Sequence, residues 1–211
     1  DDRIEFVSGL RSRQSVGKAD VSLIMIDATE GVAEQDTKIA GLAHNNGKAS
    51  IILVNKWDLV EGKKKIPDFE RELRLRFDFM SYVPILFVSV KTGLNIHRLW
   101  PTILRVYEAS TRRVATSVLN EVIAESIVQH PAPQKKGRQL RIYYATQGSV
   151  APPTFIFFVN DKRLLHFSYE RYLENRIREN FDFFGTPIVF VFKGRAARDE
   201  SASRITPEDS R

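Results

Sequence analysis

Four consecutive residues, Asn55-Lys56-Trp57-Asp58, have the types and spacing that suit recognition of a guanine base. They follow an apolar run at residues 50–54, which is typical of a buried parallel strand. In open α/β sheets, ligands bind beyond the carboxyl ends of such strands. The Asp58 carboxylate can accept both the N1 hydrogen and the exocyclic amino hydrogen of guanine, a pair that adenine lacks. We expect Asn55 on the O6/N7 side of the base and the Lys56 stem along the ring face.

A second loop makes this pattern more specific. Residues 84–88 form another apolar run, and Ser89-Val90-Lys91 follow it. Polar residues after a strand are also ordinary loop starters, so neither loop alone identifies a base site. The tripeptide resembles the second guanine loop of GTPases, usually Ser-Ala-Lys, in which the middle backbone N–H binds guanine O6 and the serine hydroxyl braces the loop. Val90 in place of alanine keeps that backbone donor.

The composition excludes several kinds of chemistry. The 211 residues include no cysteine, which rules out disulfides, thiolate metal sites and thiol catalysis. The four histidines are scattered, and we expect none of them to bind a metal. No apolar run approaches the roughly 18 residues of a membrane helix, and the acidic start is unlike a signal peptide, so we expect a cytoplasmic protein without a membrane partner. Because the chain begins with Asp1 rather than Met, we also expect a fragment of something longer.

The net charge of +6 is unevenly distributed. Residues 1–109 hold 16 basic and 15 acidic side chains, whereas residues 110–198 hold 14 basic and 7 acidic ones. A basic region attracts polyanions, and RNA is the commonest cytoplasmic candidate. The alternative is a basic surface that binds nothing.

Helical and extended patterns alternate along the first 109 residues. This order predicts half of a doubly wound α/β domain with a mainly parallel sheet. The expected helices cover residues 4–19, 35–43, 68–79 and 96–107, and the expected buried strands cover residues 21–26, 50–54 and 84–88.

Phosphate-binding residues are not apparent in this region. Asp27 follows a strand as a magnesium ligand would, but Thr29-Glu30-Gly31 is typical of a turn, so we expect Asp27 to cap or brace its loop. A phosphate loop requires G-x-x-x-x-G-K-[ST]. The nearest candidate, at Gly17-Lys18-Ala19, lacks both the first glycine and the final hydroxyl. The sequence thus predicts base binding without phosphate binding, no catalytic residue and no metal ligand.

The rest of the chain predicts a small α+β domain. We expect a linker at 110–116, a domain of order α-β-β-α-β at 117–195 and a polar tail at 196–211. Its helices are expected at 117–129, capped by Thr116 or Ser117, and at 168–181, capped by Ser168; its strands are expected at 140–145, 154–159 and 187–192. Aromatic residues between the arginines could stack on RNA bases, although most phenylalanines have core spacing. The basic candidates for RNA or ribosome contact are Lys135, Lys136, Arg138, Arg141, Arg171 and Arg178.

Several motifs together carry a resemblance to a known family. They are Ile26-Asp27-Ala28-Thr29-Glu30-Gly31, Val54-Asn55-Lys56-Trp57-Asp58-Leu59, Ile142-Tyr143-Tyr144-Ala145-Thr146-Gln147 and Leu165-His166-Phe167-Ser168-Tyr169. The chain resembles, over nearly its whole length, the ribosome-assembly GTPases called Der or EngA, which have two tandem GTPase domains and a C-terminal KH-like domain.

The resemblance implies that residues 1–109 are the later part of the second GTPase domain, a partial P-loop GTPase fold, followed by the KH-like domain. In that family the bound nucleotide is GTP or GDP, GTP with Mg²⁺ drives association with the large ribosomal subunit, and the KH-like domain packs on the first GTPase domain. The phosphate loop and the magnesium ligands would precede Asp1, so this chain alone is predicted not to hydrolyse GTP. The guanine-binding role falls to Asn55, Lys56, Asp58, Ser89, Val90 and Lys91.

One part of the KH pattern is absent. KH modules clamp the nucleic-acid backbone with a Gly-x-x-Gly loop, and none of Gly137, Gly148, Gly185 or Gly194 has a glycine three residues away. Two hypotheses therefore remain: a GTPase in ribosome assembly, or a non-catalytic fragment that binds RNA or a partner domain. The guanine loops favour the first, and the missing phosphate loop favours the second for the polypeptide itself.

Overall fold

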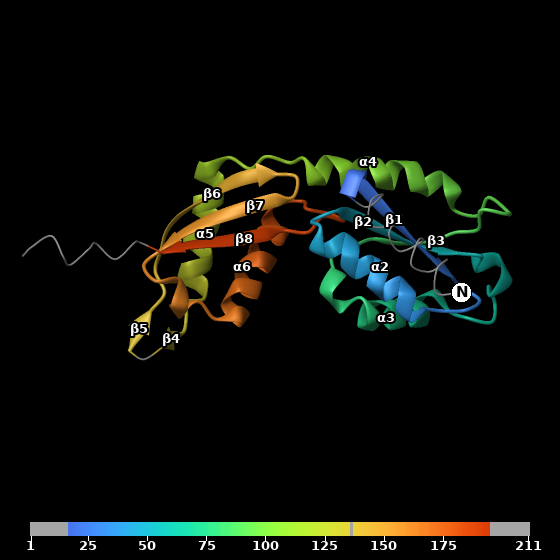
Figure 1. Cartoon of the computed structure of the whole chain (residues 1–211), viewed down its shortest axis with the longest axis horizontal. Helices are drawn as coiled ribbons and strands as arrows, with labels where there is room; N and C mark the ends of the chain where they lie inside the picture. Colours follow the sequence, from blue (N-terminus) through green and yellow to red (C-terminus); the bar gives the residue numbers. More distant parts are fainter. Residues whose placement is uncertain (1–16, 136, 195–211) are drawn as a thin grey trace, which may run out of the picture.

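The computed structural model describes residues 17–135 and 137–194. Figure 1 shows them as two units placed end to end along the long axis. We call residues 17–110 the first unit and residues 116–194 the second unit. Most of the helix expected at 4–19, the polar tail and the candidate Lys136 lie outside the described residues.

The first unit is a parallel three-stranded sheet with helices on both faces. Its strands have the order β1-β2-β3 and are parallel throughout. Helices α2 and α3 share one apolar cluster on one face, and α4 packs on the other face (Figure 1). The elements are β1 (Val21–Asp27), α2 (Glu34–Asn45), β2 (Ala49–Asn55), η1 (Trp57–Leu59), α3 (Ile66–Arg76), η2 (Asp78–Met80), β3 (Ile85–Phe87), η3 (Ile96–Arg98) and α4 (Leu99–Ser110).

Burial differs between the strands of this sheet. Residues 49–54 of β2 are at most 2% exposed, as expected for a continuous apolar run between two neighbouring strands. In β1, by contrast, burial alternates, and Leu23 and Met25 are 43% and 54% exposed. The expectation of a fully buried strand at 21–26 is therefore wrong for one face, because the cluster formed with α4 centres on β2.

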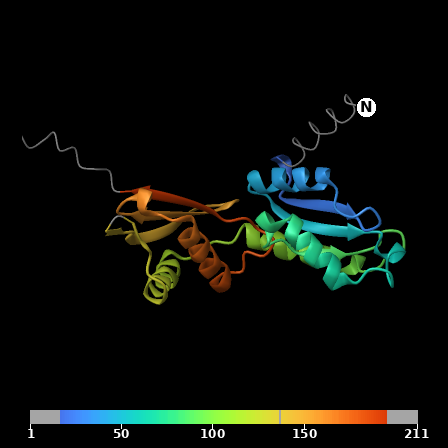
Figure 2. The ribbon, with the colours of Figure 1, turned by 90° about the horizontal axis from the view of Figure 1, so that it is seen from below.

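The second unit is a three-stranded sheet with two helices. Strand β6 pairs with β7 in antiparallel fashion, and β7 pairs with β8 in parallel. Figure 2 shows α5 and α6 on the same side of this sheet. The order α-β-β-α-β is confirmed, with a small hairpin at the expected basic loop. The elements are α5 (Thr116–Gln129), β4 (Gln134–Lys135), β5 (Arg138–Gln139), β6 (Ile142–Val150), β7 (Pro153–Val159), η4 (Lys162–Leu164), α6 (Phe167–Asn180) and β8 (Val189–Gly194).

Helix caps in this unit differ from those expected. The residue before α5 is Ala115, which has no capping side chain, so neither Thr116 nor Ser117 is the cap. At α6 the cap is His166, whose Nδ1 accepts from the Ser168 backbone N–H at 3.3 Å. An imidazole nitrogen thus replaces the expected serine oxygen as the acceptor.

Strand β6 runs five residues beyond its expected end at residue 145. The added part is polar, which is why its pattern does not indicate a strand. Gln147 explains the extension, since its side chain is 5% exposed and points inward. Its amide accepts from the Val114 N–H at 2.7 Å and donates to the Arg112 carbonyl at 2.9 Å. One buried glutamine therefore fixes both the strand and the segment between α4 and α5.

A segment after α6 joins the two units. The Gly185 carbonyl accepts from the Ser50 N–H at 2.8 Å, and the Gly185 N–H donates to the Tyr82 carbonyl at 3.1 Å. Arg105 and Asp182 form an ion pair across the same junction at 3.2 Å. Gly185 has a φ of +68°, and a Cβ there would lie 2.6 Å from Val106 Cγ2 and 3.1 Å from the Ser50 carbonyl oxygen. Glycine is thus required at this contact by both conformation and space.

We predict that Gly185→Ala lowers the free energy of unfolding by about 3 kcal/mol, because left-handed strain and overpacking add. Gly62→Ala is the matched control, since Gly62 has a φ of +82° with nothing within 4 Å of the added Cβ. It should lose only about 1 kcal/mol. Urea unfolding of both variants measures the difference, and equal losses would contradict the tight contact at Gly185.

Candidate functional site

The two loops singled out in the sequence lie together at the carboxyl edge of the first sheet. They follow β2 and β3, which are adjacent and parallel and so end at the same edge. The Trp57 N–H donates to the Val88 carbonyl at 3.1 Å, which joins the loop backbones directly. The structure thus brings the six residues of the two motifs into neighbouring loops.

Asn55 links the loops through its side chain. Its Oδ1 accepts from the Val90 backbone N–H at 3.1 Å. This is the same N–H that the family resemblance assigns to guanine O6, so the donor already has a partner within the protein. A base oxygen at this position would share or replace the bond from Asn55. Val90 itself is 62% exposed.

Ser89 braces the second loop from the inside, as expected. It is fully buried, and its Oγ accepts from the Thr92 N–H at 3.2 Å. Its carbonyl accepts from the Gly93 N–H at 2.9 Å, and Gly93 has a φ of +80°. The loop is therefore a tight turn held by one serine. Asn95, which the sequence analysis missed, donates from Nδ2 to the Phe87 carbonyl at 2.9 Å.

Lys56 is fixed by an ion pair with Asp27, which lies at the end of β1. Its Nζ lies 2.5 Å from Asp27 Oδ2. The other carboxylate oxygen accepts from the Thr29 N–H at 2.9 Å and from its hydroxyl at 2.6 Å. The Lys56 hydrogen bond, followed by those from Thr29, lowers the pKa of Asp27 to about 2. The expectation that Asp27 braces its loop is confirmed, and the brace extends to Lys56.

Asp58 directly follows the buried Trp57, and its carboxylate remains available. Trp57 is 3% exposed and packs edge-on against Phe87 and Phe69, with ring centroids 4.7 and 5.7 Å apart. Asp58 is half-buried in the short helix η1, and its carboxylate makes no hydrogen bond or ion pair with the described residues. Lys91 is exposed in the facing loop. This edge of the sheet therefore presents, three residues after Asn55, a carboxylate acceptor that no described residue engages.

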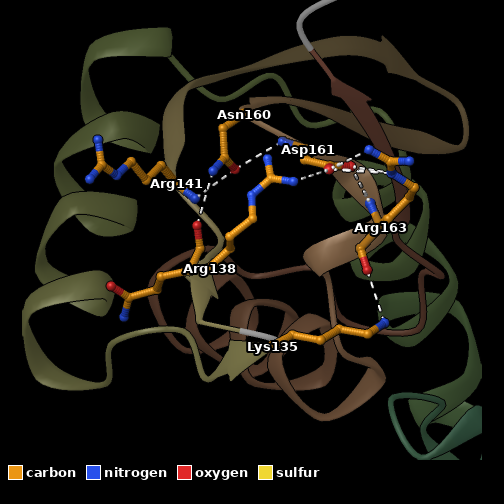
Figure 3. Close-up of polar contacts among 7 residues, drawn as sticks. Lys135, Arg138, Arg141, Asn160, Asp161 and Arg163 are labelled. Carbon is orange, nitrogen blue, oxygen red and sulfur yellow. Dashed lines mark hydrogen bonds and ion pairs between the residues drawn. The ribbon is translucent and has the colours of Figure 1, made fainter.

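A second polar cluster lies at the far end of the second sheet (Figure 3). Asp161 pairs with Arg163 at 2.8 Å and with Arg138 at 3.5 Å. Arg163, followed by Arg138, lowers the pKa of Asp161 to about 2. Lys135 Nζ donates to the Arg163 carbonyl at 3.0 Å, and the Arg141 backbone N–H donates to Asn160 Oδ1 at 2.9 Å. Sequence reasoning missed Arg163 and Asp161, because their pairing depends on the chain reversal between β7 and α6.

Two candidate arginines lie outside this cluster. Arg171 is exposed on α6. Arg178 is only 19% exposed, pairs with Glu174 at 2.8 Å and donates to the Thr186 carbonyl at 3.0 Å. Its guanidinium also lies 4.6 Å from the ring centroid of Tyr82 in the first unit. The assignment of Arg178 to an RNA-binding surface is therefore corrected: it is a structural contact at the junction.

Within residues 17–135 and 137–194, no three His, Asp or Glu side chains gather as metal ligands would. None of the helices in that part of the chain is long and apolar enough to cross a membrane.

Two family models match parts of this chain. Residues 6–122 match the family described as the elongation factor Tu GTP-binding domain. Residues 113–193 match the KH-domain-like, C-terminal domain of EngA bacterial GTPase enzymes. A solved structure of Era from Aquifex aeolicus bound to GDP and AlF4⁻ is similar at 20% identity, with a TM-score of 0.41, over 89% of this chain and 69% of that one.

Curated relatives match across both units. GTPase Der of Alkaliphilus metalliredigens is 50% identical over 199 residues, which are 94% of this chain and 45% of that protein. GTPase Der of Caldanaerobacter subterraneus is 51% identical over 193 residues, which are 91% of this chain and 44% of that protein. The chain thus spans somewhat less than half the length of these relatives. With a nucleotide-binding match over its first unit and an EngA-specific match over its second, the chain belongs to the Der, or EngA, family of GTPases.

Proposed function

We propose that this chain supplies guanine recognition to a GTP-binding protein that acts in assembly of the large ribosomal subunit. The observation that carries the proposal is the half-buried Asp58, which directly follows the buried Trp57 and whose carboxylate makes no hydrogen bond or ion pair with the described residues. A carboxylate with free acceptor oxygens at a strand-end edge complements the two adjacent donors of guanine.

Each loop residue has a specific role in the proposed guanine binding. Asp58 accepts from N1–H and the amino group, and Asn55 faces O6 and N7. The Lys56 stem covers the ring face while Asp27 holds its ammonium. Ser89 keeps the loop in shape, so that the backbone of Val90 and Lys91 lines the O6 side.

Hydrolysis is not assigned to the residues of this chain. The bound nucleotide and Mg²⁺ supply the phosphoryl chemistry, and this sequence has no G-x-x-x-x-G-K-[ST] motif to hold them. The residues of this chain bind and orient the base.

The second unit is proposed to contact ribosomal RNA in the cytoplasm. The observation that favours this part is the exposed basic cluster around Asp161, where Arg138 and Arg163 side chains are 62% and 80% exposed. In the alternative, this unit is a packing surface for a partner domain such as the first GTPase domain of the family, and the chain has no catalytic role.

Asp58→Asn, measured in a longer form that also includes a phosphate loop, should weaken GDP binding by about 100-fold, because an amide donor then faces the guanine donors. Xanthosine diphosphate, which has an acceptor at that position, should become the preferred ligand. Calorimetric titration with both nucleotides measures the switch. Asp78→Asn, an exposed aspartate remote from the loops, is the matched control. Unchanged guanine preference in Asp58→Asn would refute the role of Asp58.

Lys56→Met should raise the pKa of Asp27 from about 2 toward its ordinary value of 3.8. The substitution removes the Lys56 hydrogen bond, which lowers this pKa most, while the hydrogen bonds from Thr29 remain. A lowered carboxyl pKa stabilises the fold above pH about 3.8, and this stabilisation is lost as the pH falls toward 2. Acid should therefore reduce the stability of the variant less steeply than that of the wild type. Carbon NMR titration of Asp27 measures the shift, and Lys63→Met should leave it unaltered.

Replacing Lys135 and Arg138 by glutamine should weaken RNA binding and flatten its salt dependence, by about 1.4 in the slope of log K against log salt concentration if both contact a single strand. The control pair is Lys63→Gln with Lys65→Gln, two exposed lysines in the first unit. Fluorescence anisotropy at several salt concentrations measures both pairs. If the two double variants show the same dependence of log K on log salt concentration, the RNA contact lies elsewhere.

A further inference from the structure

The second sheet has an open face opposite its helices. Both α5 and α6 lie on one side (Figure 2), where the core includes Ala145 and Phe157. On the other side, Tyr144, Phe158 and Lys193 form a row across β6, β7 and β8, because they are register partners. The row therefore consists of two aromatic side chains followed by one basic side chain.

The two rings of this row are stacked. Their centroids lie 4.2 Å apart with an angle of 13° between the planes, and Lys193 Nζ lies 5.9 Å from the Phe158 centroid. Tyr144 is 48% exposed, and Tyr143, at an irregularity in the pairing of β6, is 54% exposed. Aromatic cross-strand pairs also stabilise sheets without any ligand. Here, however, the rings border a hollow of about 320 Å³, which leaves π surface accessible to a planar group.

A basic hollow adjoins the aromatic one. The two share Lys193 and Gly194, and the second has a volume of about 670 Å³. Asp161 is 11% exposed and orients the arginines by ion pairs, as Figure 3 shows, so that they stand at the end of the row. The four basic side chains around this hollow, against one carboxylate, are Arg138, Lys162, Arg163 and Lys193.

This arrangement distinguishes between possible occupants. The remainder of the open face includes Val189 and Val191, which are 38% and 37% exposed and would suit a protein partner. A purely apolar partner, however, would leave the cations of the adjoining hollow without counter-charges. A single nucleic-acid strand satisfies both hollows, since it carries planar bases and a phosphate backbone together.

We propose that the open face of the β6-β7-β8 sheet binds single-stranded RNA. A base stacks on Tyr144, and the neighbouring phosphates lie against Arg138, Arg163 and Lys193. The proposal rests on the RNA contact proposed above and gives it a place and a mode that require no Gly-x-x-Gly loop.

The test uses the full chain with a fluorescein-labelled ten-nucleotide RNA that contains 2-aminopurine. Tyr144→Leu keeps apolar bulk but removes the π face, and it should weaken single-strand binding about tenfold. It should also reduce the quenching of 2-aminopurine that stacking causes. Binding of the same sequence as a duplex should not change, since its bases are already stacked. Phe167→Leu is the matched control, because Phe167 is a 68% exposed aromatic residue at the start of α6.

The outcomes separate this inference from the function proposed above. If Tyr144→Leu behaves like Phe167→Leu while the Lys135 and Arg138 pair still weakens binding, RNA contact stands and the stacking face is refuted. If the wild type binds no RNA, both fail together. If Tyr144→Leu disrupts only association with a protein domain, that domain is the occupant and the inference is overturned.

Discussion

The fixed register of strand β2 is the constraint on which both the base-binding loops and the contact with the second unit depend. The strand is hydrogen-bonded to parallel strands on both sides, and residues 49–54 are at most 2% exposed. A one-residue slip would turn every side chain to the opposite face, so its register is strongly fixed. The carboxyl end of β2 delivers Asn55 to the base-binding loops. Near its amino end, the Ser50 N–H donates to the carbonyl of Gly185. The second unit is therefore attached to the same short strand that positions the guanine loop.

The strand ends at the candidate site hold one another in place. Asp27 at the end of β1 pairs with Lys56, and Asn55 at the end of β2 accepts from Val90 in the loop after β3. The left-handed conformation of Lys56, with a φ of 61°, turns the chain so that Trp57 enters the core. Binding to a site arranged in advance avoids part of the entropy cost of ordering loops. These contacts are thus consistent with a rigid edge rather than loops that form around the base.

Local sequence patterns were sufficient to predict the strands that carry the base-binding loops. Apolar runs located all three strands of the first sheet, and the polar residues directly after two of them located the candidate site. The same reasoning missed Gln147 and Gly185, because a buried polar side chain and a required glycine depend on residues distant in the sequence. It also misplaced Arg178, since residue type alone does not distinguish an exposed cation from one stacked on Tyr82.

The charge of the second unit must therefore be judged by position rather than by count. Arg176 pairs with Glu179 at 2.6 Å and Arg178 with Glu174 at 2.8 Å, so part of the basic excess is neutralised along α6. At the far end of the sheet, Asp161 is shared by Arg138 and Arg163, which leaves one positive charge in excess among these three groups. Such a carboxylate lowers the net attraction for phosphate, but it restricts two long side chains and so reduces the entropy lost when they bind. A surface of this kind favours a ligand with a defined arrangement of charges over any polyanion. The stacked rings beside it add a geometric requirement that charge alone does not impose.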